Sequence, residues 1–202
     1  MVKLCRRLSN YIELLVFNLF VRNNFGFCGK NSLLYFPFRI DGEENINIGS
    51  HTTLQKGAWV SCYPVSVDKK ATLIIGSGCV FGYNNHIISV NSITIEDYVL
   101  TANNVYVSDN SHSYVDITKP IMLQGVDVKS PVVIGSGTWL GENVCVVGAS
   151  VGKNCVIGSN SVVTRDIPDF SVAVGAPARV IKKFSHTSGC WVTVNEVCIG
   201  GK

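Results

Sequence analysis

The chain repeats a six-residue pattern over much of its length, and this repeat constrains the fold more than any other feature. Hexads beginning at Ile48, Ile75, Ile95, Ile134 and Val151 each start with an aliphatic residue, followed most often by glycine. Such a unit is a short strand plus a turn, too small to bury its own apolar side. Stacked units bury it collectively, with strands about 4.8 Å apart. The repeat therefore predicts a parallel β-solenoid.

Two further positions of the hexad support this prediction. The fourth is usually Gly or Asn, which tolerate the positive φ of a tight turn. The fifth is small enough to fit inside a corner. The fourth-position residues are Gly57, Gly78, Asn84, Asn104, Gly137, Asn143, Asn154 and Asn160, and the fifth-position residues are Thr52, Ala58, Cys79, Val99, Val105, Thr138, Cys155 and Ser161. We expect the first and fifth positions to face the core and the sixth to point outward.

Composition agrees with a β-rich globular protein. The chain has 202 residues, enough for one domain, with 47% hydrophobic and 15% charged residues. A net charge of +3 without a Lys/Arg stripe argues against nucleic acid as a partner. The eight cysteines form no CxxC pair, and the N-terminal apolar stretch lacks a cleavage site. These features favour a reduced, cytoplasmic location.

The repeat is interrupted after "VSDNSH", residues 107–112. The hexad register puts Asn110 in the turn position, Ser111 in the small position and His112 in the outward sixth position. The repeat then disappears over residues 113–131. Loops of this length without structure of their own are uncommon and often functional. We therefore predict that an extended loop leaves the solenoid where it can cover His112.

Four segments carry a family resemblance: "SDNSH", "GTWLGENV", "IGSNSVVTRDIP" and "VGAPARVIKK". Together with the hexads they resemble the acetyl-CoA-dependent O-acetyltransferases of maltose, galactosides and nodulation factors, and most closely those of lipopolysaccharide and capsule sugars. The resemblance implies an all-β fold, the left-handed parallel β-helix, over residues 36–183. It also implies a homotrimer with active sites between subunits. The apolar spacing of residues 1–35 predicts a helical segment, and residues 184–202 match no part of the family pattern and form a tail.

Residue types indicate the chemistry. A sugar hydroxyl is a poor nucleophile at neutral pH, and histidine has a suitable pKa to act as its general base. The resemblance implies that His112 fills this role in direct transfer of acetyl to a sugar hydroxyl of a bacterial surface polysaccharide, O-antigen or capsule. Asp109 either orients the imidazole or is a solvated turn residue. The other expected substrate contacts are His86, Tyr106 and Trp139, although His86 could equally be an ordinary surface residue.

For the co-substrate, the resemblance implies that acetyl-CoA lies in a groove between neighbouring prisms, without a metal. The residues that match the family's CoA contacts are Trp139 and Gly141 near the pantetheine, Ser159, Thr164 and Arg165 along the last coils, and Arg179 and Lys182 near the 3′-phosphate.

Other functions remain as alternatives. A xenobiotic acetyltransferase, of the chloramphenicol or streptogramin type, is the main one. A non-catalytic β-helix scaffold would predict flat polar arrays and no loop after a histidine. The γ-type carbonic anhydrases need three histidines on a metal, two of them closely spaced, and histidines at 51, 86, 112 and 186 do not fit. Serine acetylation is disfavoured because that family's large helical N-terminal domain is lacking.

Three segments depart from the pattern. The step "VVGAS", residues 146–150, is one residue short, and the step from Ile87 to Ile95 has eight residues. The N-terminal segment has Leu8, Ile12, Leu15 and Leu19 along one face of a helix. This face either covers the open end of the prism or makes peripheral contact with the inner face of the membrane.

Overall fold

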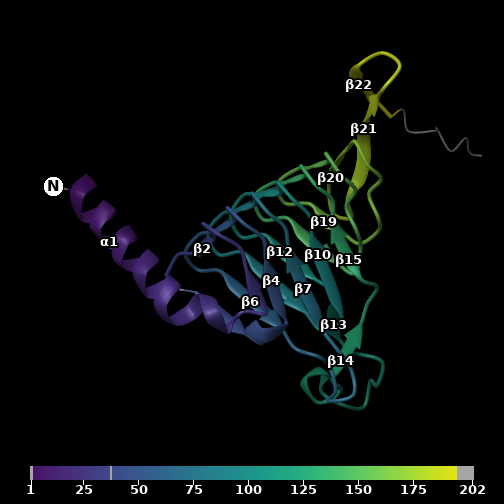
Figure 1. Cartoon of the computed structure of the whole chain (residues 1–202). Coiled ribbons are helices and arrows are strands. Elements are labelled where there is room, and N and C mark those ends of the chain that lie inside the picture. Colours follow the sequence, from purple (N-terminus) through teal and green to yellow (C-terminus); the bar gives the residue numbers. More distant parts are fainter. Residues whose placement is uncertain (1, 37, 195–202) are drawn as a thin grey trace, which may run out of the picture.

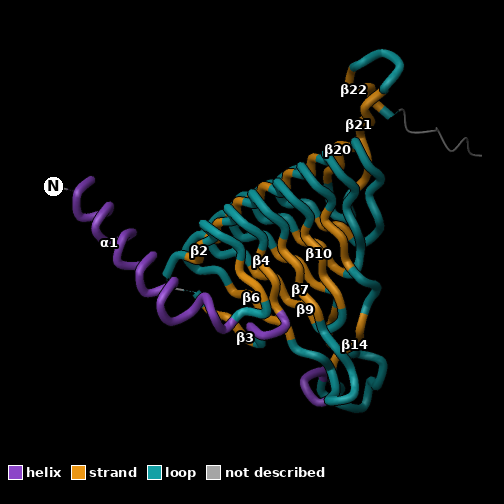
Figure 2. The backbone as a smooth tube through the Cα atoms, in the orientation of Figure 1, coloured by secondary structure: helices purple, strands orange, loops and turns teal. Residues whose placement is uncertain are grey.

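The computed structural model describes the backbone of residues 2–36 and 38–194 and, in the N-terminal helix, side chains from residue 8 onward. Three parallel sheets, here called A, B and C, form the sides of a prism around one hydrophobic core. The first five coils each contribute a strand to A, then B, then C, and the later coils continue sheet A only through bridges at Val151 and Ile167 (Figures 1 and 2). The predicted parallel β-solenoid is confirmed.

The strands are short because each occupies one side of a coil. Sheet A contains β1 (Phe27–Cys28), β4 (Ile46–Ile48), β7 (Thr72–Ile75), β10 (Ser92–Ile95) and β15 (Val132–Ile134). Sheet B contains β2 (Leu33–Leu34), β5 (Thr53–Leu54), β8 (Val80–Phe81), β11 (Leu100–Thr101), β16 (Trp139–Leu140), β18 (Val156–Ile157), β20 (Ser171–Val174), β21 (Arg179–Ser185) and β22 (Cys190–Thr193). Sheet C contains β3 (Arg39–Asp41), β6 (Trp59–Cys62), β9 (His86–Ser89), β12 (Tyr106–Ser108), β17 (Cys145–Val147) and β19 (Val162–Val163).

The hexad register is confirmed almost throughout. All eight fifth-position residues are buried, from Thr52 to Ser161. All eight fourth-position residues have positive φ, between 49° at Asn154 and 81° at Gly57. The short step at 146–150 keeps this turn, because Gly148 has a φ of 59° and Ala149 fills the small buried position. The repeat thus specifies both the corners and the core.

Polar groups inside the prism are paired. The Thr52 hydroxyl donates to the Gly76 carbonyl at 2.7 Å and accepts from the Cys79 amide at 3.1 Å. Thr138 repeats this arrangement with Gly152 and Cys155. At the corner between sheets B and C, the asparagines 84, 104, 143 and 160 form a ladder of side-chain hydrogen bonds of 3.0 to 3.3 Å. These bonds satisfy groups that burial or stacking would otherwise leave unpaired.

The interruption differs from its prediction in two ways. The coil ends at Ser108, and Asn110 lies in an extended strand rather than in a positive-φ turn. The reason is that β13 (Asn110–His112) pairs with β14 (Val126–Val128) in an antiparallel ladder that leaves the prism. The loop between them is also ordered: it contains η4 (Ile121–Leu123), and the Gln124 side chain bonds to the backbone of Asp116 and Lys119.

The helical segment is shorter than the predicted 1–35. It comprises α1 (Val2–Val16), η1 (Phe17–Val21) and η2 (Arg22–Asn24), and the first coil begins at Phe27 rather than at residue 36. The first hexad, residues 28–33, does not match the repeat because its first position is Cys28 rather than an aliphatic residue. Its Asn31 nevertheless has a φ of 60° and its Ser32 is buried. A further short helical turn, η3 (Glu43–Asn45), connects the first two coils.

At the far end of the prism, sheet B continues into an antiparallel extension that projects from it (Figure 1). Strand β21 turns back along β20, and β22 follows β21 (Figure 1). The boundary predicted at residue 184 therefore falls inside β21, and the end of the predicted tail, residues 195–202, lies outside the described residues. No helix among the described residues combines the length and apolar character needed to cross a membrane.

Candidate active site

His112 is the last residue of β13, at the corner where the chain passes from sheet C to sheet A. Its backbone is opposite Val126 of β14, and the next amide, of Ser113, donates to the Gly125 carbonyl at 3.1 Å. The His112 side chain is exposed, so the loop does not cover it as predicted. The imidazole is thus held on a short two-stranded ribbon and is open to a reactant.

Asp109 lies at the root of this ribbon and is fully buried. Its carboxylate accepts hydrogen bonds from the Ser89 hydroxyl at 3.0 Å and from the backbone amides of Val90 and Asn91 at 2.8 and 2.9 Å. The Asn110 side-chain amide donates to it at 3.2 Å. Because these bonds occupy the carboxylate and it has no surface, the expected roles of contacting substrate or bonding to the imidazole are not supported. Asp109 instead anchors the start of β13.

Sheet C carries an outward row at the start of its strands, next to the corner with sheet B. Trp59, His86 and Tyr106 are directly in register on β6, β9 and β12. The Trp59 and His86 rings meet edge to face at 5.4 Å, and the Trp59 indole N–H donates to Asp41 at 2.9 Å. His86 and Tyr106 therefore face outward from sheet C, whose other edge leads to His112, and their expected contact with substrate stays a prediction. Trp59 was not predicted, although its sixth position in a hexad was a usable signal.

Sheet B carries a second outward row. Trp139, the first residue of β16, is 45% exposed. It is in register with Val156 of β18, and Val156 is in register with Val172 of β20. Val172 in turn pairs with Lys182 of β21. A register shift between Val172 and Ala173 puts Arg179 opposite Val174. Since residues directly opposite in an antiparallel pair share a face, both cations lie on the outer side of sheet B with Trp139.

The remaining predicted residues divide between two corners. Thr164 and Arg165 follow β19 of sheet C and lie at the same kind of corner as His112. Gly141 and Ser159 lie where sheet B passes to sheet C. Gly141 is buried, and a Cβ there would come within 2.8 Å of the Ser159 backbone nitrogen, so close coil stacking requires the glycine. Only Ser159 of this pair is exposed.

One chain does not bring all of these residues together. In a triangular coil, the corner between sheets C and A lies opposite sheet B. His112, Thr164 and Arg165 are at that corner, whereas Trp139, Arg179 and Lys182 face outward from sheet B. A ligand that contacts both groups must therefore lie between two copies of the prism.

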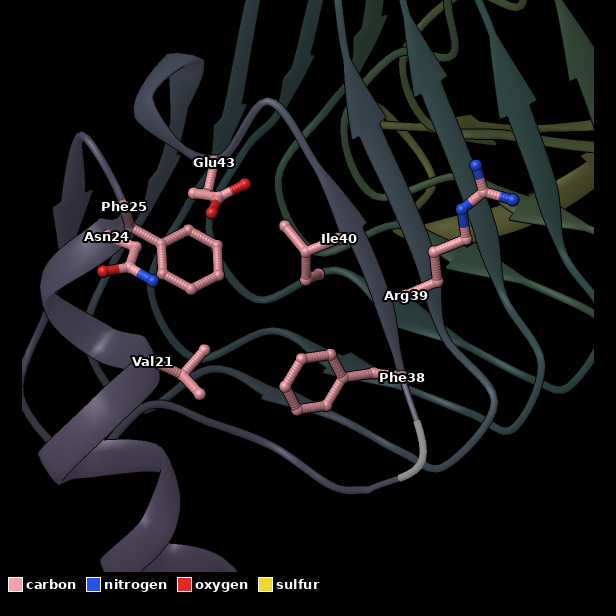
Figure 3. A pocket seen from close by; sticks show the side chains of 7 residues that line it. All are labelled: Val21, Asn24, Phe25, Phe38, Arg39, Ile40 and Glu43. Carbon is pink, nitrogen blue, oxygen red and sulfur yellow. The ribbon is translucent and has the colours of Figure 1, made fainter.

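Hollows within the described part of the chain agree with this geometry. A cavity of about 400 Å³ lies between η2 and β3, where Val21, Phe25 and Ile40 face a common space (Figure 3). Another, of about 520 Å³, lies along residues 133–136 and 150–153. Neither is lined by His112 or Trp139. His112 and Trp139 are both exposed and lie outside these two cavities.

The buried cysteines are poor nucleophiles. Cys62, Cys79 and Cys155 are buried, and burial raises the pKa of the Cys62 thiol to about 12. Burial also raises the pKa of Cys79 and Cys155 above its ordinary value. Among the described side chains, no three His, Cys, Asp or Glu residues are grouped so that they could hold a metal ion. The exposed imidazole of His112 is the group at this corner best suited to proton transfer.

Comparison with known proteins places these features in a family. The family described as hexapeptide repeat of succinyl-transferase matches residues 72–109 and 131–165. A putative lipopolysaccharide biosynthesis O-acetyl transferase of Escherichia coli strain K12 is 32% identical over 173 residues, which are 79% of this chain and 82% of that protein. The chain belongs to the hexapeptide-repeat acetyltransferases. It is accordingly an acyl-transferring enzyme of the O-acetyltransferase group.

Two further similarities extend this assignment. A probable acetyltransferase of Mycobacterium tuberculosis is 43% identical over 132 residues, but these cover 64% of this chain and only 44% of that protein. A hexapeptide-repeat containing acetyltransferase from Vibrio cholerae, solved with acetyl coenzyme A, has a TM-score of 0.56 at 24% identity and covers 91% of this chain and 89% of its own. The latter shows a shared fold.

Proposed function

We propose that this acetyltransferase moves the acetyl group of acetyl-CoA to a hydroxyl of a sugar in a bacterial surface polysaccharide, O-antigen or capsule, with His112 as general base. The observation that carries the proposal is the exposed imidazole of His112, held on a ribbon that leaves the prism at the end of sheet C, the sheet whose outer face carries His86 and Tyr106. The lipopolysaccharide O-acetyl transferase similar to this chain supports a sugar acceptor.

The reaction needs one proton carrier. The His112 imidazole accepts the proton of the sugar hydroxyl while that oxygen attacks the thioester carbonyl. When the carbon–sulfur bond breaks, the imidazolium returns the proton to the departing thiolate. The products are the O-acetyl sugar and CoA, and no covalent acyl-enzyme forms. The raised pKa of the buried Cys62 thiol supports direct transfer, because a protonated thiol is a weak nucleophile.

The active enzyme is proposed to be a homotrimer of left-handed β-helices with its active sites between subunits. The argument is the separation of the two residue groups, since His112 and Trp139 are on opposite parts of each triangular coil. Cyclic packing puts sheet B of one subunit against the loop corner of the next, and every subunit then contributes to two sites.

Acetyl-CoA fits the outward row of sheet B. Trp139 and Lys182 are separated by β18 and β20, so their strands are about 14 Å apart at the usual spacing. The apolar row Trp139, Val156 and Val172 suits the pantetheine arm, and Arg179 and Lys182 at its end suit the 3′-phosphate. Ser159, Thr164 and Arg165 complete the proposed cofactor contacts. The six described cysteines are free, which supports action in the reduced cytoplasm.

The deciding experiment supplies acetyl-CoA with a panel of surface-polysaccharide glycans, nucleotide sugars and chloramphenicol, and identifies the products by mass spectrometry. We expect a mass gain of one acetyl group on a sugar, sensitive to alkaline deacetylation as an ester. His112→Ala should lower kcat about 10²- to 10⁴-fold, the usual contribution of a general base. His51→Ala, an exposed histidine in a distant turn, is the control. Acetylation of chloramphenicol alone would reject the sugar acceptor.

A further inference from the structure

The helical segment formed by α1 and η1 presents an apolar stripe that nothing in the described chain covers. Leu8, Ile12, Leu15 and Leu19 recur at helical spacing and are 59%, 51%, 43% and 66% exposed. Tyr11 and Phe20 extend this stripe and are also exposed. Figure 1 shows α1 leaving the first coils and standing clear of the prism. A stripe of this size on a projecting helix indicates contact with another surface.

The opposite side of the helical segment is fixed to the prism. Phe17 is fully buried in the core, and Glu13 pairs with Lys56 at 3.0 Å. The Arg22 guanidinium donates to the carbonyls of Cys28 and Gly29 at 2.8 and 2.6 Å. These contacts hold the end of the segment while its apolar stripe faces away. The prediction that the segment covers the open end of the prism therefore applies to Phe17 and its neighbours, not to the exposed stripe.

The charge of α1 indicates which kind of surface its apolar stripe contacts. The helix contains three basic residues, Lys3, Arg6 and Arg7, and one acidic residue, Glu13. Because Glu13 is paired with Lys56 of the prism, the positive charge of the helix is left without a compensating acidic residue of its own. An amphipathic helix with apolar residues along one side and an excess of basic residues is suited to the interface of an anionic bilayer.

We infer that α1 binds the surface of an anionic lipid bilayer, with Leu8, Ile12 and Leu15 of α1 and Leu19 of η1 entering the acyl boundary. The helix lies in the interface and the prism stays in water. The inference is independent of the proposed acceptor and of His112. Symmetric pairing of α1 with the same helix of a second copy is the competing occupant. A parallel pair is disfavoured because it would bring two sets of basic residues together, and an antiparallel pair offers them no acidic partner, since Glu13 is paired with Lys56.

Vesicle flotation of the full chain tests this inference. The probes are vesicles of phosphatidylcholine alone and of phosphatidylcholine with phosphatidylglycerol. The wild type should float with the anionic vesicles. It should remain in the bottom fraction when only neutral vesicles are present. Replacing Lys3, Arg6 and Arg7 by Gln should weaken the partition about 100-fold, from the usual contribution of three basic residues. Leu8→Glu with Ile12→Glu should abolish it.

The control is Val67→Glu, which places one such negative charge on a fully exposed apolar residue elsewhere on the chain. It should bind anionic vesicles as the wild type does. Sedimentation of every variant should show an unchanged oligomeric state. The inference is overturned if the wild type ignores anionic vesicles, if Val67→Glu loses binding equally, or if the α1 variants dissociate an assembly, which would assign the stripe to a second copy.

Discussion

The Ser89 hydroxyl donates a 3.0 Å hydrogen bond to the buried carboxylate of Asp109, which joins the end of β9 to the residue preceding β13. The amides of Val90 and Asn91 donate to the same carboxylate. The corner of one coil thus fixes the point at which the His112 ribbon leaves the next coil. Asp109 is a positioning residue in this arrangement, three residues from the imidazole.

Replacing Asp109 by Asn should therefore lower both stability and turnover. An amide must turn its N–H₂ toward backbone donors, and leaving such a buried group unpaired costs about 1–3 kcal/mol. Chemical unfolding should show this loss, and kcat should fall while the KM for acetyl-CoA is unchanged. Asp68→Asn, at an exposed residue, is the control. If Asp109 only positions the ribbon, the acid limb of the pH–rate profile should fall at the same pH in Asp109→Asn as in the wild type. Loss of this limb in the variant would mean that Asp109 itself carries the proton.

The buried thiols should resist alkylation in the native protein. Burial raises the pKa of Cys62 to about 12 and raises those of Cys79 and Cys155, so all three remain protonated at neutral pH. Cys190 is exposed. Iodoacetamide should modify Cys190 and spare the other three, as peptide mass spectrometry can determine. Acetyl transfer should survive this treatment. Rapid labelling of Cys62 in the active enzyme would contradict the fold at that corner.

The sequence predicted the prism because its repeat is a local rule. Within each hexad, one aliphatic residue marks the position that faces the core. One residue able to adopt positive φ, such as Asn104 or Gly137, marks the turn. The first coil was missed where Cys28 occupies the aliphatic position. Tyr98 and Phe170 also adopt positive φ, which residue type does not indicate.

The surroundings of His112 could not be predicted in the same way. Hexad counting placed Asn110 in a turn, but its conformation is set by pairing with Val128, which is eighteen residues further along the chain. The carboxylate of Asp109 is likewise engaged by Ser89 from the preceding coil. Such contacts between distant segments leave no periodic signal. The outward direction of His86 and Trp139 was predictable because it follows from the repeat alone.

Reversing the charge of Arg179 and Lys182 should weaken acetyl-CoA binding without unfolding the prism. Both side chains are exposed on the outer face of sheet B, in line with the row that begins at Trp139. Arg179→Glu with Lys182→Glu should raise the KM for acetyl-CoA and reduce the preference for it over its dephospho analogue. Lys183 pairs with the buried Ser171 and so points to the other face, which makes Lys183→Glu the matched control. An unchanged preference in the double variant would exclude these cations from the phosphate site.

Two inactive variants should restore each other if the site is shared between subunits. His112→Ala removes the base at the loop corner, and Trp139→Ala removes the exposed ring of sheet B on the opposite part of the coil. Mixed trimers then contain interfaces in which one subunit supplies His112 and its neighbour supplies Trp139. Random assembly of equal amounts makes about a quarter of all interfaces complete. Co-refolding the two variants should therefore return about a quarter of wild-type kcat, measured by release of CoA. A mixture no more active than its components would mean that each chain carries its own complete site, despite the separation of these two residues in the prism.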